Sequence, residues 1–252
     1  MAEAVGAHLD RMDQANIYPV LPTVYEGHLH GLPITFQATP HAIVVNRHAQ
    51  RFCSEYDFNL GEALDRRDPL TGAVVNLPAW LIADSRFLQS SPALRWYGAK
   101  DPKWLVRAPS IRALAERIGL VPEALAETVE RWNGFCAQGH DDDFVRGENT
   151  WERYKSGRVD GKQTNQALGA VERGAFIAVR FNRAILGTKG GPRTNPFGQV
   201  LRKDGSVIAG LYCAGVAMAN PIGTRAVGPG TTIGPCLTWG YICAQTISQS
   251  PG

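Results

Sequence analysis

A glycine-rich stretch between residues 223 and 234 has the residue types best suited to a ligand site. The apolar run 207–215 precedes it, and a segment with helical spacing begins near Pro235. Glycine lets a backbone approach a flat ligand closely, because no Cβ intervenes. The first amides of a helix are unpaired donors with partial positive charge, which suits an anionic group. The sequence therefore predicts a strand, a close-approach loop and a helix start around one ligand.

An ordinary strand-to-helix crossover with a glycine-rich turn explains the same residues equally well. Residues 228–234 contain one residue too many for the G-x-G-x-x-G fingerprint of dinucleotide-binding folds. No acidic residue ends a second strand about 20 positions further on. The chain thus offers no phosphate-cradling half of a dinucleotide site.

Five blocks in a fixed order give the chain a resemblance to a known family. They are IVVNRHAQRF at 43–52 with Glu55, WLIAD at 80–84, RIGLVPEALAETVERWN at 117–133, LGTKGGPRTN at 186–195, and GLYCAGVAMANPIGTRAVGPGTTIGPCLTWGYICAQ at 210–245. The last block is similar to the C-terminal FAD signature of flavoproteins of the fumarate reductase and 3-ketosteroid dehydrogenase type. The sequence resembles the C-terminal portion of such an FAD-dependent oxidoreductase.

The resemblance implies a set of cofactor contacts. In relatives a capping domain interrupts the FAD domain, the isoalloxazine lies between them, and hydride passes between a substrate CH–CH bond and flavin N5. By matching position, Gly215 and Val216 approach the flavin through their backbone. Gly230, Thr231, Thr232 and Ile233 cover its pyrimidine end. The helix start there suits the negative N1–C2=O edge of a reduced flavin, which gives Gly230 a catalytic role as well.

The catalytic positions depart from the best-known relatives. Fumarate reductases have a histidine where this chain has Gly187 and a proton-donating arginine near Asn59, so their activity is not expected. Ketosteroid dehydrogenases have a tyrosine where this chain has Ala226. Their second tyrosine corresponds to Tyr56 if a short gap is allowed and to Asn59 if it is not. Tyr56 is therefore either the proton-transfer group or a packing aromatic, and the sequence leaves both open.

Two cations are candidates for substrate contacts. Arg225 has a planar fork that suits a substrate carboxylate or carbonyl, but a solvated loop arginine looks the same in a sequence. Lys189 is either a cation at the edge of the pocket or a turn residue. We count both, together with Asn59, as candidate substrate-binding residues.

Composition excludes several functional classes. The net charge is +3 over 252 residues with scattered basic residues, which does not indicate nucleic acid. No apolar run approaches the roughly 18 residues of a membrane span, and residues 1–16 do not resemble a signal peptide. Five cysteines without a C-x-x-C pair favour reduced thiols and a cytoplasmic protein. The histidine spacing predicts no metal site.

Periodicity predicts a helix over residues 2–14, short strands at 42–45, 80–83, 176–179 and 199–201, and a buried strand at 207–215. Two helices are expected within 110–138, the first capped by Ser110 and ended by Gly119, the second starting near Pro122. The polar stretch 138–169 is expected to be a surface excursion. A last helix is expected over about 235–247.

The resemblance also predicts the domain organisation. Residues 1–25 and 175–252 are expected to form an incomplete FAD-binding domain of α/β type, interrupted by an α+β capping domain over 26–174; the overall class is α+β. The ADP-binding part of relatives is expected upstream and is not in this sequence. We therefore expect an FAD-dependent dehydrogenase or reductase of a small molecule, with a steroid-like or other enone as one option. The alternatives are an inactive fragment, or a subunit that needs a separate ADP-binding chain or forms a homo-oligomer.

Overall fold

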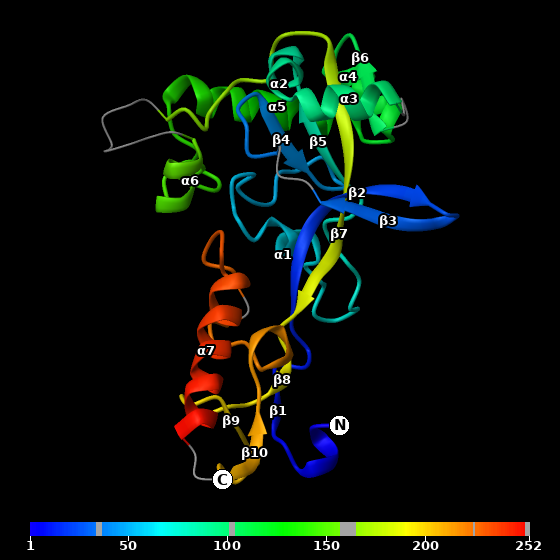
Figure 1. Cartoon of the computed structure of the whole chain (residues 1–252). Helices are drawn as coiled ribbons and strands as arrows, with labels where there is room; N and C mark the ends of the chain where they lie inside the picture. The colour runs from blue at the N-terminus through cyan, green and yellow to red at the C-terminus, as the bar shows by residue number, and fades with distance from the viewer. Residues whose placement is uncertain (34–36, 101–103, 157–164, 224, 250–252) are drawn as a thin grey trace. The chain divides into compact units, whose positions relative to one another are not determined.

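Two compact units make up the chain, whose computed structural model describes residues 1–33, 37–100, 104–156, 165–223 and 225–249. Unit 1 comprises Met1–Ile17 and Ile185–Gly252, and unit 2 comprises Tyr18–Ala184. Strands β2 (Ala15–Tyr25) and β7 (Phe176–Thr188) each have residues in both ranges, and they are neighbours in one sheet (Figure 1). Two adjacent strands therefore carry the chain from one unit to the other.

The sheet of unit 2 has the strand order β3-β2-β7-β5-β4, with β6 also paired to β7. Hydrogen bonds join β2 to β3, β4 to β5, and β7 to both β5 and β6 in antiparallel register. The remaining strands of this sheet are β3 (His28–Pro33), β4 (Ala42–Val45), β5 (Ala79–Ala83) and β6 (Val106–Ala108). The predicted strands at 42–45 and 80–83 are confirmed.

Alternate residues of these strands supply two apolar cores, one on each face. Val44 and Leu81 belong to one core, and Ile43 and Ile82 belong to the other. This is the alternation expected of strands covered on both sides. Five helices complete the cores: α1 (Leu60–Leu64), α2 (Ser85–Ser90), α3 (Pro92–Lys100), α4 (Ile111–Ile118) and α5 (Pro122–Gln138). Helix α6 (Thr150–Lys155) also belongs to unit 2, but it contributes no residue to either core.

Helices α4 and α5 begin and end as their sequence predicts. The Ser110 hydroxyl accepts a hydrogen bond from the Ala113 amide, and Gly119 ends α4 with φ +75°. Pro122 occupies the first turn of α5. The apolar stripe of α5 is buried against the sheet, with Trp132 fully inaccessible.

Unit 1 has little regular structure besides its last helix. Its elements are η1 (Glu3–Val5), β1 (Leu9–Asp10), β8 (Gly191–Pro192), β9 (Gln199–Leu201), β10 (Val207–Tyr212), η3 (Gly215–Ala217) and α7 (Ile233–Gln249). β1 pairs with β8, and β9 with β10, both antiparallel. Figure 1 shows α7 in red beside the β9–β10 hairpin, and Thr246 Oγ1 donates a 3.0 Å hydrogen bond to the Phe197 carbonyl there. The cluster of buried apolar residues described in this unit is small: Ala7, Val200 and Ile208.

Three predictions about elements are wrong. The helix expected over 2–14 is only the single turn η1, because Gly6 adopts φ +86° and the chain then extends into β1. The strand at 207–215 ends at Tyr212 and is largely exposed, since among the described residues β9 alone pairs with it. The stretch 138–169 contains α6 and buried charged residues, because Asp141 and Arg146 form ion pairs and hydrogen bonds with the segment 39–55. Residues 157–164 lie outside the described part.

The mixed helix and antiparallel-sheet content confirms the α+β class. No helix among the described residues is long and apolar enough to cross a membrane. The same residues contain no group of three or more His, Cys, Asp or Glu side chains placed to hold a metal ion.

Candidate functional site

The glycine-rich loop of unit 1 leaves backbone accessible where close approach was predicted. Gly230 has φ +87°, and a Cβ added there would meet nothing within 4 Å. Gly215 begins η3 with φ +70°, where an added Cβ would lie 3.4 Å from Cys236 Sγ on α7. Val216 is 55% exposed beside it. The backbone of Gly230 is thus open to a flat ligand. The backbone of Gly215 instead lies close to Cys236, where η3 packs against α7.

Thr231 closes the loop from within. Its buried hydroxyl donates to the Gly228 carbonyl at 2.6 Å and accepts from the Gly228 and Val227 amides. Thr231 is therefore a loop-forming residue whose side-chain hydrogen bonds are already used inside the protein. Thr232 and Ile233 are exposed at the start of α7, and within the described residues their amides have no acceptor. Two helix-start donors consequently face solvent.

The two predicted cations differ in exposure. Lys189 is 3% exposed, and its backbone bonds to Gln14 and Asn220 within unit 1. Arg225 is exposed on the loop that leads to Gly230. Lys189 therefore lies inside the packing of unit 1, whereas Arg225 remains at the surface of the loop.

Tyr56 and Asn59 belong to unit 2, so the predicted site residues divide between the two units. Tyr56 is 2% exposed, and the Arg146 guanidinium carbon lies 4.7 Å from the centre of its ring. Asn59 is half-buried and precedes α1, with its amide donating to Asp57 Oδ1 at 2.8 Å. The structure brings Tyr56 together with Arg146, a residue that the sequence analysis did not single out.

A buried network of charges lies beside Tyr56. Arg51 donates two hydrogen bonds to Glu55 and two to Asp141, at 2.9–3.0 Å. Arg146, with a fully buried side chain, donates to Glu55 Oε2 at 2.9 Å. Both guanidinium groups stack on the ring of Trp132, at 4.5 and 4.8 Å. Bidentate, stacked arginines of this kind fix side-chain geometry as well as charge.

Burial and charge act in opposite directions on the acidic groups here. Burial would raise the pKa of Glu55, but Arg51 and Arg146 outweigh it and lower the pKa. Burial likewise raises the pKa of the Tyr56 phenol, and Arg146 opposes part of that rise. Burial raises the pKa of Glu152 against the hydrogen bond from the Gly147 amide. Glu152 is thus the acidic group of this region that burial pushes toward its neutral form.

A sequence signal for part of this network existed. Asn149 and Glu152 have the N-x-x-E spacing of a helix start, and the Asn149 side chain does accept from the Glu152 amide at 2.8 Å. Arg51 and Glu55 are four residues apart, the spacing of an ion pair on one helical face. Nothing in the sequence indicated that Asp141 and Arg146 would complete the network, because they lie 90 and 91 residues from Arg51 and Glu55.

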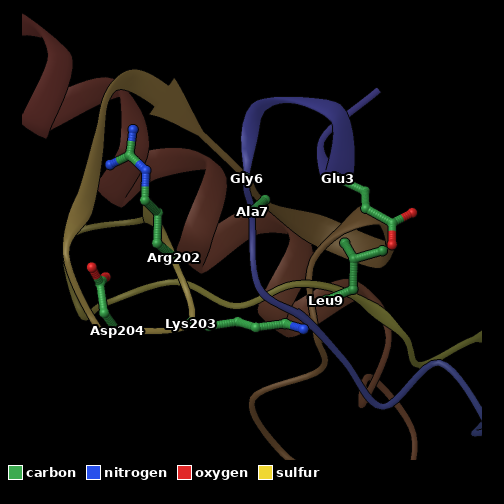
Figure 2. A pocket seen from close by; sticks show the side chains of 7 residues that line it. All are labelled: Glu3, Gly6, Ala7, Leu9, Arg202, Lys203 and Asp204. Carbon is green, nitrogen blue, oxygen red and sulfur yellow. The ribbon is translucent and has the colours of Figure 1, made fainter.

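An open hollow of about 510 Å³ lies elsewhere in unit 1, between η1 and the turn after β9 (Figure 2). Its charged lining consists of Glu3, Asp204, Arg202 and Lys203, two acids and two bases. Arg202 Nη1 already donates to the Val207 carbonyl at 3.0 Å. The charges of this hollow cancel, so it favours no ion of either sign.

Two features together indicate the class of this protein. An α+β unit contains a buried tyrosine and a buried arginine, and a glycine-rich loop at the start of a helix follows that unit in the chain. Residues 1–233 match the family described as FAD binding domain, and the chain belongs to that family. The family resemblance inferred from the sequence is confirmed, and FAD is the cofactor of the family, as expected.

Relatives narrow the class within the family. The chain is 36% identical to the 3-oxosteroid 1-dehydrogenase of Mycolicibacterium smegmatis over 99% of this chain and 45% of that protein. It is 34% identical to the 4-oxocyclohexanecarboxylate 2-dehydrogenase of Sinomonas cyclohexanicum, over 98% of this chain and 44% of that protein. The 3-ketosteroid Δ1-dehydrogenase of Sterolibacterium denitrificans, solved with 1,4-androstadiene-3,17-dione, has a TM-score of 0.82 at 30% identity, covering 98% of this chain and 46% of that one.

The chain therefore spans a little under half the length of the relatives that it matches. All three are named as dehydrogenases of ring ketones. Nearly the whole of this chain takes part in each match.

Proposed function

We propose that the chain supplies the flavin-facing loop and the substrate cap of an FAD-dependent dehydrogenase that acts on a CH–CH bond of a ring ketone. Residues 1–25 and 175–252 would be the FAD-domain part and 26–174 the cap. The observation that carries the proposal is the open, left-handed Gly230 next to unpaired helix-start amides, in a chain 34–36% identical to ring-ketone dehydrogenases. Neutral steroid ketones and oxocyclohexane acids are the two substrate types that the relatives support.

Most of the predicted residues then have a role, whereas Asn59 and the buried Lys189 are given none. Gly230 and the amides of Thr232 and Ile233 would stabilise the negative charge that a reduced flavin carries at N1–C2=O. Gly215 and Val216 would border the ring system through backbone, and Thr231 would hold the loop in shape. Arg225 would orient a polar group of the substrate. Bound FAD would accept the hydride, and the paired proton would pass to a side chain of the cap, for which Tyr56 is the candidate.

A flavin absorbance spectrum tests the proposal. The chain would be titrated with FAD alone, and again together with the part of the M. smegmatis relative that lies outside the match. Because no G-x-G-x-x-G segment occurs in the 252 residues, we expect weak or no FAD uptake by the chain alone. Uptake in the mixture, followed by bleaching on addition of a 3-oxosteroid or 4-oxocyclohexanecarboxylate, supports the function. Tight stoichiometric FAD in the chain alone contradicts the cofactor argument, and a flavin that neither ketone reduces contradicts the reaction.

A further inference from the structure

A separate cavity of about 290 Å³ lies within unit 1, between the β1–β8 pair and residues 218–221. Its polar lining includes Asp10, Arg11, Arg193 and Trp239, contributed by three segments of the chain. A volume near 300 Å³ is at the small end of ligand pockets. The cavity is therefore suited to a compact ligand rather than to a dinucleotide.

Three donor groups at this cavity lack a hydrogen-bond acceptor within the described part of the chain. The Arg11 guanidinium has no partner, and Arg193 only approaches Asp10 Oδ2 at 4.0 Å. Trp239 has a buried Nε1–H without an acceptor. Buried donors are normally paired, so an unsatisfied indole N–H next to two arginines points to an acceptor that comes from outside the chain.

Charge and shape select the acceptor. Two arginines and one aspartate leave one net positive charge on the lining, which matches a monoanion better than a dianion. One part of the wall is apolar, made by Pro196, Met218, Ala219 and Pro221, and Thr194, Asn195 and Asn220 add polar groups. Arginine cations together with this apolar wall fit a molecule with one charged group and a hydrocarbon body. Guanidinium groups pair with carboxylate oxygens in planar geometry.

Arg11 is also held in an uncommon backbone conformation. Its φ is +56°, which residues other than glycine seldom adopt. Its amide donates to Asp10 Oδ1 at 2.8 Å and its carbonyl accepts from the Gln14 amide at 3.1 Å. A Cβ added at Gly223 would lie 3.6 Å from Arg11 Nη1, so the side chain reaches the start of the glycine-rich loop. Strain of this kind often accompanies a functional site.

We propose that this cavity binds a small organic carboxylate, with the carboxylate between Arg11 and Arg193 and the hydrocarbon body on the apolar wall. The site is independent of the flavin chemistry proposed above, and it is tested without FAD. Two-dimensional NMR of the chain with ¹⁵N-labelled tryptophan reports on the Trp239 indole N–H, which Trp239→Phe assigns. The probes are cyclohexanecarboxylate, the uncharged cyclohexylmethanol, and inorganic phosphate.

We expect cyclohexanecarboxylate to shift the Trp239 signal saturably, and cyclohexylmethanol and phosphate to bind at least tenfold more weakly. Arg11→Gln and Arg193→Gln should each weaken binding about tenfold or more, as expected for the loss of a charged hydrogen bond. Arg66→Gln, which removes one exposed positive charge in unit 2, should leave it unchanged. Ligand-induced rises in unfolding temperature provide the same comparison in a second measurement. The proposal is overturned if no probe gives a saturable shift or if phosphate binds best. It is also overturned if the protein with both Arg11→Gln and Arg193→Gln binds cyclohexanecarboxylate as tightly as the original.

Discussion

The hydroxyl of Tyr56 has to reach a substrate if it is to move a proton, yet Tyr56 is only 2% exposed in unit 2. Arg146 covers one face of its ring and opposes the rise that burial causes in its pKa. A nearby guanidinium makes the phenolate more accessible, which suits a general base, while the stacking itself suits a packing residue. Only a change that removes the hydroxyl and keeps the ring separates the two roles.

Tyr56→Phe in the FAD-loaded enzyme is that change. We expect flavin reduction by a ring ketone to slow about 10²–10⁴-fold, the range for a lost acid–base group, with the unfolding midpoint nearly unchanged. Rapid-mixing absorbance measures the bleaching rate directly. Reduction at the original rate would make Tyr56 a packing residue and move the proton-transfer role elsewhere.

Arg146 should matter for stability whatever Tyr56 does. Arg146→Met leaves Glu55 with a single cation and strips hydrogen bonds from the Thr39 and Ala42 carbonyls. Breaking a buried pair in this way costs about 3–5 kcal/mol, which denaturant unfolding would detect. Arg131→Met is the matched control, because Arg131 also pairs with a carboxylate, that of Asp143, but its side chain is 61% exposed. This variant should lose far less stability than Arg146→Met. If both variants lost the same free energy of unfolding, the buried ion pairs would stabilise the fold no more than the exposed one.

Glu152 gives the fold a pH dependence of predictable sign. Its pKa is raised in the folded state, so as pH rises past the usual value of 4.5 the unfolded chain releases its proton first. The ionisation of this group therefore lowers the stability of the fold progressively as the pH rises above 4.5. Glu152→Gln keeps an oxygen that can accept from the Gly147 amide. In this variant the free energy of unfolding should fall less, as the pH rises above 4.5, than in the original protein. Urea titrations at several pH values test this, with exposed Glu130→Gln as the charge control; an unchanged slope in Glu152→Gln contradicts it.

At the scale of elements, a substitution in the loop that leads into α7 should affect cofactor binding without preventing the chain from folding. A Cβ at Gly230 would meet no atom within 4 Å, so we expect the folding penalty of Gly230→Leu to come from left-handed strain of about 1–2 kcal/mol. Gly205→Leu, in the turn before β10, has φ +85° and the same open space, and carries the same strain. In the mixture with the complementary part of the M. smegmatis relative, we expect only Gly230→Leu to abolish FAD binding, measured by absorbance after gel filtration. Loss of FAD in both variants would indicate general instability instead.

Residues that cap or end a helix predicted correctly the elements whose bounds depend on neighbouring residues in the sequence. Ser110, Gly119 and Pro122 set the ends of α4 and α5, and they behave as their types dictate. The helix expected at 2–14 failed at Gly6, whose left-handed turn outweighed an apolar spacing. Arg146 was missed because a charged residue in a polar stretch looks solvated until its partner, 91 residues away, is known. The individual glycines of the loop were identified, but the internal hydrogen bonds of Thr231 were not, since they depend on how the loop closes.

The apolar surface of the whole molecule is unevenly distributed. Of the nineteen exposed large apolar side chains in the described residues, fourteen belong to unit 1. Ile233, Leu237 and Tyr241 follow one another at four-residue spacing on α7 and are each more than 60% exposed. Exposed apolar patches beyond several hundred Å² usually mark association surfaces.

We therefore expect the purified chain to self-associate or to require a partner chain. Light scattering after gel filtration should show species larger than 27.4 kDa, which shrink when Leu237 and Tyr241 are both changed to lysine. Val121→Lys, at a 63% exposed position of unit 2, is the control and should change nothing. A monodisperse monomer with one cooperative unfolding transition would contradict the expectation.

The path of β2 and β7 has a consequence for how this architecture can vary. The chain leaves unit 1 in one strand and returns in the strand beside it, so the two junctions of unit 2 belong to a single neighbouring pair. Adjacent strands are only about 4.8 Å apart. A segment with such closely spaced ends is an insertion. It can be lengthened, shortened or exchanged for another segment without changing the path of the chain in unit 1. The part proposed to meet the substrate is thereby free to diversify while the part proposed to hold the flavin keeps its sequence order.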